Sequence, residues 1–213
     1  KKISKNKILI EGIQNINLTD ILYAKKFGYK IKLLSISEII NNKLSERVHP
    51  CLISKESHIS NIDGVLNAVV IDGLPAGRSV LQGEGAGPGP TSSAIISDLC
   101  SVLKAGVKYP FGISSKLRKP IGKFDTLKHN CSSYFRIEVK DLPGVLSSIT
   151  KTFAKNKISI KNLIQNPDKK NKKASIIIIT HENLEKNYKN LFTNLINNKF
   201  VIKKPTFIRI EKV

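Results

Sequence analysis

The chain has 213 residues, of which 40% are hydrophobic, so it can bury the core of one large domain or two modest ones. It carries 36 Lys and Arg residues against 16 Asp and Glu, a formal net charge of +20. The lysines are scattered, and the sequence has no Trp and no basic run with interleaved aromatic residues, so we expect no nucleic-acid partner. No apolar run is long enough to span a membrane, and no membrane partner is expected.

Cysteine and histidine spacing bounds the chemistry further. Cys51, Cys100 and Cys131 are odd in number and widely separated, so we expect free thiols in a reducing, cytoplasmic compartment. The histidines form no H-x-x-x-H pair, and no metal site is predicted. Because the chain begins at Lys1 and contains no methionine, we expect it to be the later part of a longer protein.

The first half of the chain mixes predicted strands with two helices. One helix is expected over Asn17–Phe27, with Thr19 as its cap and Gly28 as its stop, and another from about Thr91 to Lys104. Pro50 is expected to place its strand at a sheet edge or a bulge. The strands are predicted where apolar residues alternate or run together, at Ile8–Ile10, Tyr29–Ile36, Arg47–Ile53, Val65–Ile71 and Ser79–Gln82.

A glycine-rich loop, Gly83–Pro90, leads into the second helix. Glycine accepts positive φ and lets a ligand approach the backbone, while Thr91 or Ser92 can cap a helix whose unpaired N–H groups favour an anion. A tight connection that needs glycine only for its turns explains the loop as well. Pro90 stands where the dinucleotide fingerprint has its third glycine, so the loop is compatible with a nucleotide contact but not with a complete nucleotide site.

The second half begins after a stretch, residues 108–131, in which periodicity fails and Pro, Gly and Lys dominate, so we place a linker there. Residues 132–213 then follow the order β-α-β-β-α-β, the split arrangement of a ferredoxin-like sandwich, which makes the fold class α+β. Asp141 is expected to cap the first helix, with Pro143 and Gly144 shaping its entry. The predicted elements are strands Tyr134–Val139, Ile158–Ile164, Ala174–Thr180 and Phe200–Ile210, and helices Gly144–Asn156 (inward residues Val145, Leu146, Ile149 and Phe153) and Asn183–Asn197.

Several short motifs occur in a fixed order over residues 8 to 105: Glu11-Gly12-Ile13, Gly28-Tyr29, Val48-His49-Pro50, Asn67-Ala68-Val69, and Gly85-Ala86-Gly87-x-x-Pro90-Thr91 followed by Asp98. In this combination they resemble homoserine dehydrogenase. The run Asp141-Leu142-Pro143-Gly144-Val145-Leu146 resembles the strand-to-helix turn of an ACT regulatory domain. The resemblance implies a mixed-sheet substrate and dimerisation region over 1–107, a linker over 108–131 and an ACT domain over 132–213.

The resemblance also implies a function. It implies an NAD(P)-dependent oxidoreductase that interconverts L-homoserine and L-aspartate 4-semialdehyde in threonine, methionine and isoleucine biosynthesis. In the family, the nucleotide-binding domain and the catalytic lysine lie upstream of the matching segment. No catalytic residue is therefore assigned to this chain, and alone it is expected to be inactive. Gly87 is implied to contact the NADP or NAD cofactor. The residues implied to bind L-threonine as an effector are Asp141, Pro143, Gly144, Val145 and Leu146, in a homodimer or homotetramer.

Other polar residues have simpler explanations than catalysis. Lys32 fits an outward-pointing strand lysine, Asp98 a hydrogen-bonding helix residue, and His49 a packed histidine, while Glu11 is a candidate carboxylate near a domain interface. A non-enzymatic amino-acid-binding regulatory protein remains the alternative function.

Overall fold

The computed structural model describes residues 8–104, 112, 114, 116–117, 121–168 and 170–213. The described residues form two compact units, one that joins the residues up to Lys55 with Gly122–Val213, and one that spans Glu56–Ile121. These units cross the predicted boundaries because strands from both ends of the sequence share one sheet. The division into 1–107, 108–131 and 132–213 stays a prediction about the family's domains.

The larger unit is built on a mixed sheet whose main path runs β1-β3-β11-β7-β9-β8. The strands are β1 (Leu9–Ile10), β2 (Tyr29–Ile40), β3 (Lys43–Ser54), β6 (Gly122–Lys123), β7 (Asn130–Lys140), β8 (Ile160–Asp168), β9 (Lys173–Thr180), β10 (Asn183–Leu184) and β11 (Thr206–Ile210). In the order β11-β7-β9-β8 every neighbour is antiparallel, with α3 (Val145–Lys155) after β7 and α4 (Glu185–Ile196) before β11. This confirms the predicted β-α-β-β-α-β order and the α+β fold class.

Strand β3 pairs along both of its edges. Strand β2 lies antiparallel to it along its whole length, while β6, β1 and β11 follow one another along the other edge. Pro50 is therefore at neither a sheet edge nor a bulge, contrary to the prediction. It lies between Val48, which pairs with Ile10, and Leu52, which pairs with Ile210, at the break between two partner strands. A missing N–H removes no ladder bond at that break.

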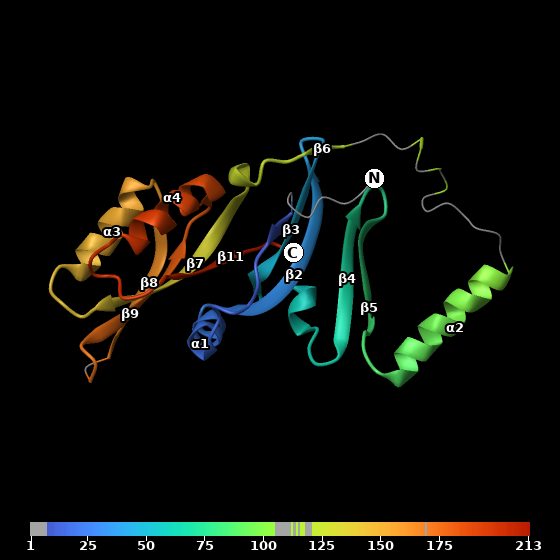
Figure 1. Cartoon of the computed structure of the whole chain (residues 1–213), viewed down its shortest axis with the longest axis horizontal. Helices are drawn as coiled ribbons and strands as arrows, with labels where there is room; N and C mark the ends of the chain where they lie inside the picture. The colour runs from blue at the N-terminus through green and yellow to red at the C-terminus, as the bar shows by residue number, and fades with distance from the viewer. Residues whose placement is uncertain (1–7, 105–111, 113, 115, 118–120, 169) are drawn as a thin grey trace. The chain divides into compact units, whose positions relative to one another are not determined.

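Helices cover both faces of this sheet (Figure 1). On one face α3 and α4 pack over Phe135 and Ile137 of β7. On the other face, Ala24 of α1 (Leu18–Lys26) joins a cluster that contains Tyr134 of β7 and Ile208 of β11. Successive strand residues point to opposite faces, which is why the neighbours Tyr134 and Phe135 belong to different cores.

The start of α1 differs from its prediction. Asn17, and not Thr19, is the cap: its side chain accepts from the Asp20 N–H at 3.2 Å, and the Asp20 carboxylate accepts from the Asn17 N–H at 2.9 Å. This reciprocal pair is a capping box, which satisfies two helix-end donors and so outcompetes a cap two residues later. Gly28, with φ +83°, follows the helix end as predicted.

The smaller unit contains a hairpin of β4 (Leu66–Gly73) and β5 (Gly77–Glu84), followed by α2 (Pro88–Lys104). Helix α2 buries none of its residues within the chain, and Leu99 and Val102 on its apolar face are 57% and 75% exposed. Among the residues that the structure describes, every helix is too short or too polar to cross a lipid bilayer.

Candidate functional site

The glycine loop ends at Gly87, the residue predicted to contact the cofactor. Gly87 has φ +121°, and its carbonyl accepts from the Thr91 N–H at 3.2 Å. Helix α2 therefore begins at Pro88, three residues earlier than predicted, and neither Thr91 nor Ser92 caps it: the Ser92 hydroxyl donates back to the Pro88 carbonyl at 2.7 Å.

This helix start offers little to an anion. Pro88 and Pro90 have no N–H group, and the Thr91 N–H is already bonded, so within this described turn Gly89 supplies the one backbone donor left for a ligand. The expectation that several unpaired N–H groups would favour an anion here is wrong. A cofactor contact at Gly87 would depend on close approach to bare backbone instead.

The turn between β7 and α3 holds the residues implied to bind a regulatory amino acid. Asp141 is exposed, and its N–H donates to the Lys172 carbonyl at 3.0 Å. The cap of α3 is Gly144, with φ +82° and no side-chain capping bond, so the prediction that Asp141 caps this helix is wrong. The Asp141 carboxylate is left at the surface next to a helix start.

Donors at the start of α3 are available to a ligand. The Val145 N–H bonds the Leu142 carbonyl at 3.3 Å, and the first helical bond runs from Ser148 to Gly144 at 3.0 Å. The N–H groups of Leu146 and Ser147 have no backbone acceptor among the described residues. Two unpaired N–H groups at a helix N-terminus suit a carboxylate.

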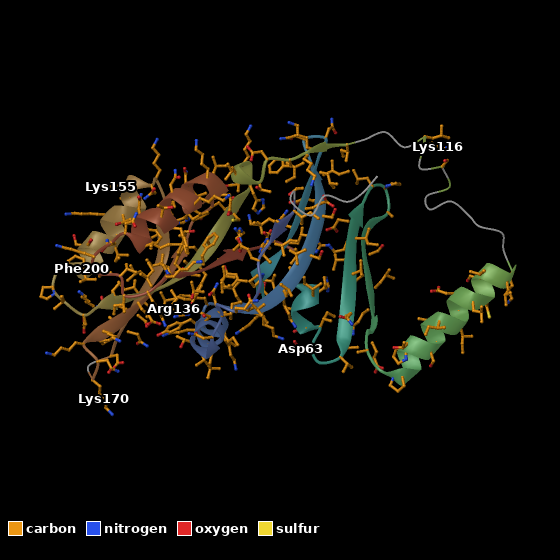
Figure 2. All side chains as sticks on the ribbon, viewed as in Figure 1. Asp63, Lys116, Arg136, Lys155, Lys170 and Phe200 are labelled. Carbon is orange, nitrogen blue, oxygen red and sulfur yellow. The ribbon has the colours of Figure 1, made fainter. Side chains whose placement is uncertain are left out.

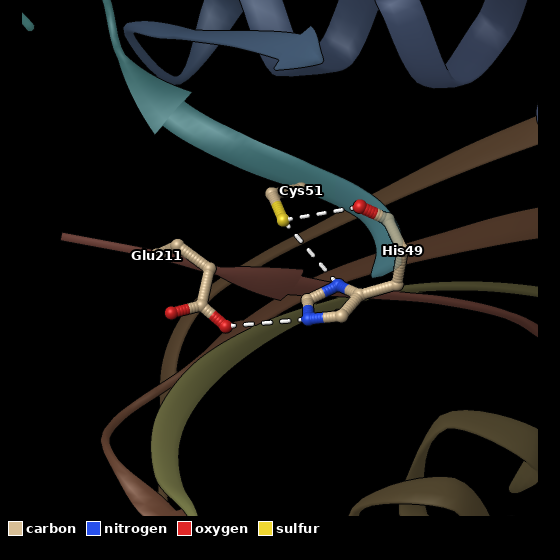
Figure 3. A group of neighbouring side chains, drawn as sticks. All are labelled: His49, Cys51 and Glu211. Atoms are coloured by element: carbon tan, nitrogen blue, oxygen red, sulfur yellow. Dashed lines mark hydrogen bonds and ion pairs between the residues drawn. The ribbon is translucent and has the colours of Figure 1, made fainter. Parts of the chain in front are cut away.

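A buried ionic cluster links β3 to the residue after β11, and the sequence did not predict it. His49 and Cys51 lie on one face of β3, and Glu211 meets them there (Figure 3). Alternation along the strand places the buried Arg47 on the same face. The Glu211 carboxylate accepts from Arg47 at 3.2 and 3.0 Å, lies 3.3 Å from the His129 Nε2 atom, and lies 3.5 Å from the His49 Nε2 atom. Alternation at positions 47, 49 and 51 was a signal for a shared face, but no local pattern points to Glu211.

The cluster holds donor types that a transition metal accepts, but its protonation favours hydrogen bonding. Burial, and next the Arg209 charge, lowers the pKa of His49, while burial raises the pKa of the Cys51 thiol. Burial alone would raise the pKa of Glu211, but hydrogen bonds from His129 and Arg47 outweigh it and lower the pKa to about 2. The carboxylate pairs with Arg47 across the junction between β3 and the residue after β11, while the buried His49 Nε2 atom forms no hydrogen bond with a described residue.

Two more buried arginines connect distant segments. Arg136 of β7 donates to Asp20 of α1 at 2.7 and 3.2 Å and is 5% exposed. Figure 2 labels it over the strands, whereas Lys155 and Lys170 lie at the outline of the molecule. Arg209 of β11 donates to Glu11 at 2.7 and 3.0 Å. Glu11, considered above as an interface carboxylate, therefore has a structural partner within the larger unit.

The remaining candidate residues lie on different elements. Lys32 is half-buried in β2 opposite Cys51, and Asp98 is exposed on α2. Lys32 and the Asp141 turn belong to the larger unit, and Gly87 and Asp98 to the smaller one.

Fold and site together define a protein that joins a ferredoxin-like ACT domain to a further α/β region with a glycine loop. Residues 1–100 match the family model described as homoserine dehydrogenase, and residues 133–195 match the model described as ACT domain. Over these two segments the chain is therefore similar to homoserine dehydrogenases and to ACT domains.

Named relatives agree with this assignment over nearly the whole chain. Homoserine dehydrogenase of Helicobacter pylori is 37% identical over 204 residues, which cover 96% of this chain and 48% of the relative. The enzyme of Neisseria gonorrhoeae is 32% identical over 215 residues, with the same coverage of 96% and 48%. The crystal structure of the Thiobacillus denitrificans homoserine dehydrogenase superposes with a TM-score of 0.81 at 31% identity, covering 97% of this chain and 48% of that one. The chain spans about half the length of the relatives it matches.

Proposed function

We propose that this chain works as part of a homoserine dehydrogenase, which interconverts L-homoserine and L-aspartate 4-semialdehyde with NADP or NAD in the cytoplasmic biosynthesis of threonine, methionine and isoleucine. The observation that carries the proposal is the match of one chain, in order, to the homoserine dehydrogenase and ACT family models. The chain's own contribution is the glycine loop at Gly87, where bare backbone permits close approach of the cofactor.

The proposal is tested with a chimera that joins this chain to the part of the Helicobacter pylori relative that it does not match. NADPH oxidation in the presence of L-aspartate 4-semialdehyde is the readout, and we expect turnover in the chimera and none in either part alone. A Gly87→Val variant should raise the KM for NADPH, because a side chain at φ +121° is strained and blocks the backbone. A folded chimera that binds NADPH yet shows no turnover would refute the proposal.

We also propose that the turn from Asp141 to Leu146 binds L-threonine as a feedback effector. The Leu146 and Ser147 N–H groups suit its carboxylate, and the exposed Asp141 carboxylate suits its ammonium group. Thermal unfolding with millimolar L-threonine, against L-homoserine, L-lysine and D-threonine, measures this directly. The midpoint should rise with L-threonine alone and return to baseline in Asp141→Asn, and equal shifts with D-threonine would contradict a specific site.

The alternative, a non-enzymatic amino-acid-binding regulator, shares the threonine response. The two functions separate in the chimera, because a regulator without an enzymatic role confers no turnover. We expect no binding of DNA by the chain. An affinity for DNA that falls steeply as the salt concentration rises would contradict this expectation.

A further inference from the structure

A cavity of about 530 Å³ opens in the larger unit between α4, β11 and the segment that begins at Glu11. This volume lies in the range of roughly 300–1,000 Å³ found for small-molecule sites. None of the described residues that line it belongs to the turn from Asp141 to Leu146, so the cavity is distinct from the proposed threonine site.

The cavity contains a fixed anionic group. Arg209, 2% exposed, donates to Glu11 at 2.7 and 3.0 Å and to Glu185 at 2.9 and 2.5 Å. Two carboxylates against one guanidinium leave a net negative charge. Burial alone would raise the pKa of Glu11, but the Arg209 hydrogen bond outweighs it and lowers the pKa, so Glu11 stays ionised. Its side chain is 38% exposed, and its oxygens keep lone pairs for a further donor.

The same cavity carries two lysines, Lys189 and Lys204, that form no ion pair with a described residue, although the charge of Lys189 acts on Glu11. Lys204 lies 5.7 Å from the centroid of the Phe192 ring, which is a cation–π contact and leaves its hydrogen bonds to be made elsewhere. These two ammonium groups are available to an anion.

The remaining wall is apolar. Phe192 and Phe207 are half-buried, and the Phe207 ring is held by Tyr188 at 5.5 Å between centroids and by Arg209 at 4.7 Å. Aromatic surface on the wall of a concave site, beside a few charged groups, gives a ligand both burial and orientation.

We propose that this cavity binds a free α-amino acid with an apolar or aromatic side chain. The ammonium group of the ligand donates to Glu11, its carboxylate accepts from Lys189 and Lys204, and its side chain packs on Phe192 and Phe207. A zwitterion satisfies both signs of charge, whereas an amine offers the lysines no carboxylate and a simple carboxylate gives Glu11 no donor beyond Arg209.

Isothermal titration calorimetry of the full 213-residue chain tests this proposal, with L-phenylalanine and L-leucine as the probes. Phenethylamine and 3-phenylpropionate are the matched analogues that lack the carboxylate and the amino group, respectively. We expect saturable binding of the amino acids and at least about tenfold weaker binding of each analogue, because each one loses a charge-assisted hydrogen bond.

Variants on α4 locate the site. Lys189→Gln should weaken binding about tenfold, whereas Lys186→Gln, an exposed position on the same helix outside the cavity, should leave it unchanged. Thr193→Trp should abolish binding by filling the cavity, with circular dichroism as the check on folding. Asp141→Asn should not alter it, which separates this site from the threonine site. The proposal is overturned if neither amino acid binds, if the analogues bind equally well, or if Lys186→Gln has the effect of Lys189→Gln.

Discussion

Arg47, His49 and Cys51 share one face of β3 because alternate strand residues point the same way, and Glu211 gives that face a buried counter-charge. Glu211 is 7% exposed and accepts two hydrogen bonds from Arg47. A buried pair of this kind is weak evidence for net stability, but removing Glu211 leaves the buried Arg47 with Glu38, which is 40% exposed, as its one remaining carboxylate among the described residues. The residue is therefore sensitive to substitution and to acid.

Glu211→Gln should lower the free energy of unfolding at pH 7 by about 2–4 kcal/mol, measured by urea denaturation. The pKa of Glu211 falls from an ordinary 4.5 to about 2 on folding, so its contribution is complete above about pH 4.5 and is lost as the pH falls toward 2. The variant should accordingly lose less stability than the wild type over that interval.

The control is Glu182→Gln, which breaks the exposed ion pair with Lys212, whose side chain is 88% exposed. It should change the unfolding free energy by less than about 1 kcal/mol. Equal losses of unfolding free energy in the two variants would mean that a buried ion pair costs no more to break here than an exposed one.

Gly144, the cap of α3, has a left-handed backbone conformation that most side chains disfavour. It has φ +82°, and a Cβ built on it meets nothing within 4 Å, so the cost of a side chain is conformational and not steric crowding by neighbours. Gly144→Val should destabilise the chain by about 1–2 kcal/mol and Gly144→Asn by less, because Asn tolerates the left-handed region. Thermal unfolding of both variants measures the difference, and an equal cost would contradict the backbone argument.

Among the elements, α1 is attached at its first turn. Asp20 completes the capping box with Asn17 and also accepts from Arg136 and from the Tyr134 hydroxyl, the latter at 2.9 Å. One carboxylate thus ends the helix and fixes it to β7.

Asn17→Ala should cost about 1 kcal/mol, because it removes only the cap. Asp20→Asn should cost about 3 kcal/mol, because it also removes the buried carboxylate of Arg136, which is 5% exposed and keeps only the partly exposed Glu138 as a carboxylate partner. Urea denaturation gives both values, and amide hydrogen exchange should show α1 losing protection first in Asp20→Asn. Similar costs for the two variants would show that the ion pair adds nothing beyond the cap.

Helices and strands with one apolar face could be predicted from the sequence. The pairing of distant strands and of distant charged residues could not. The period of 3.6 residues located α3, whose Val145, Ile149 and Phe153 are buried, although Leu146 remains 37% exposed at its first turn. Proline is expected at a sheet edge or a bulge because, inside a strand with one continuous partner on each side, it removes a ladder hydrogen bond. Strand β3 instead changes partner beside Pro50, from β1 to β11, and this change cannot be read from the sequence. Arg47 and Glu211 are 164 positions apart, and no local pattern encodes such a contact.

For the whole molecule, the uncovered apolar face of α2 has a direct consequence. Ile95, Leu99 and Val102 recur on one side of the helix and are each more than half exposed. We propose that a second copy of the chain covers this face in the homodimer or homotetramer expected for the family.

Leu99→Glu should shift the chain toward the monomer, since it places a charge at the centre of that face, and light scattering after size exclusion measures the mass. Ser97→Glu, on the opposite side of the helix, is the control and should leave the mass unchanged. A monomeric wild-type chain at micromolar concentration would contradict assembly through α2.

Strand β11 pairs in parallel with β3 and antiparallel with β7. During vectorial synthesis, β3 leaves the ribosome long before β11 has been translated. At roughly 5–20 residues per second, that interval is on the order of ten to thirty seconds. For that time Arg47 and His49 lack Glu211. Cys51 and Leu52 lack their pairing with β11, and the nascent chain presents an unpaired strand edge to its surroundings. Nascent-chain recognition by chaperones should therefore concentrate on β3, and end when β11 is inserted.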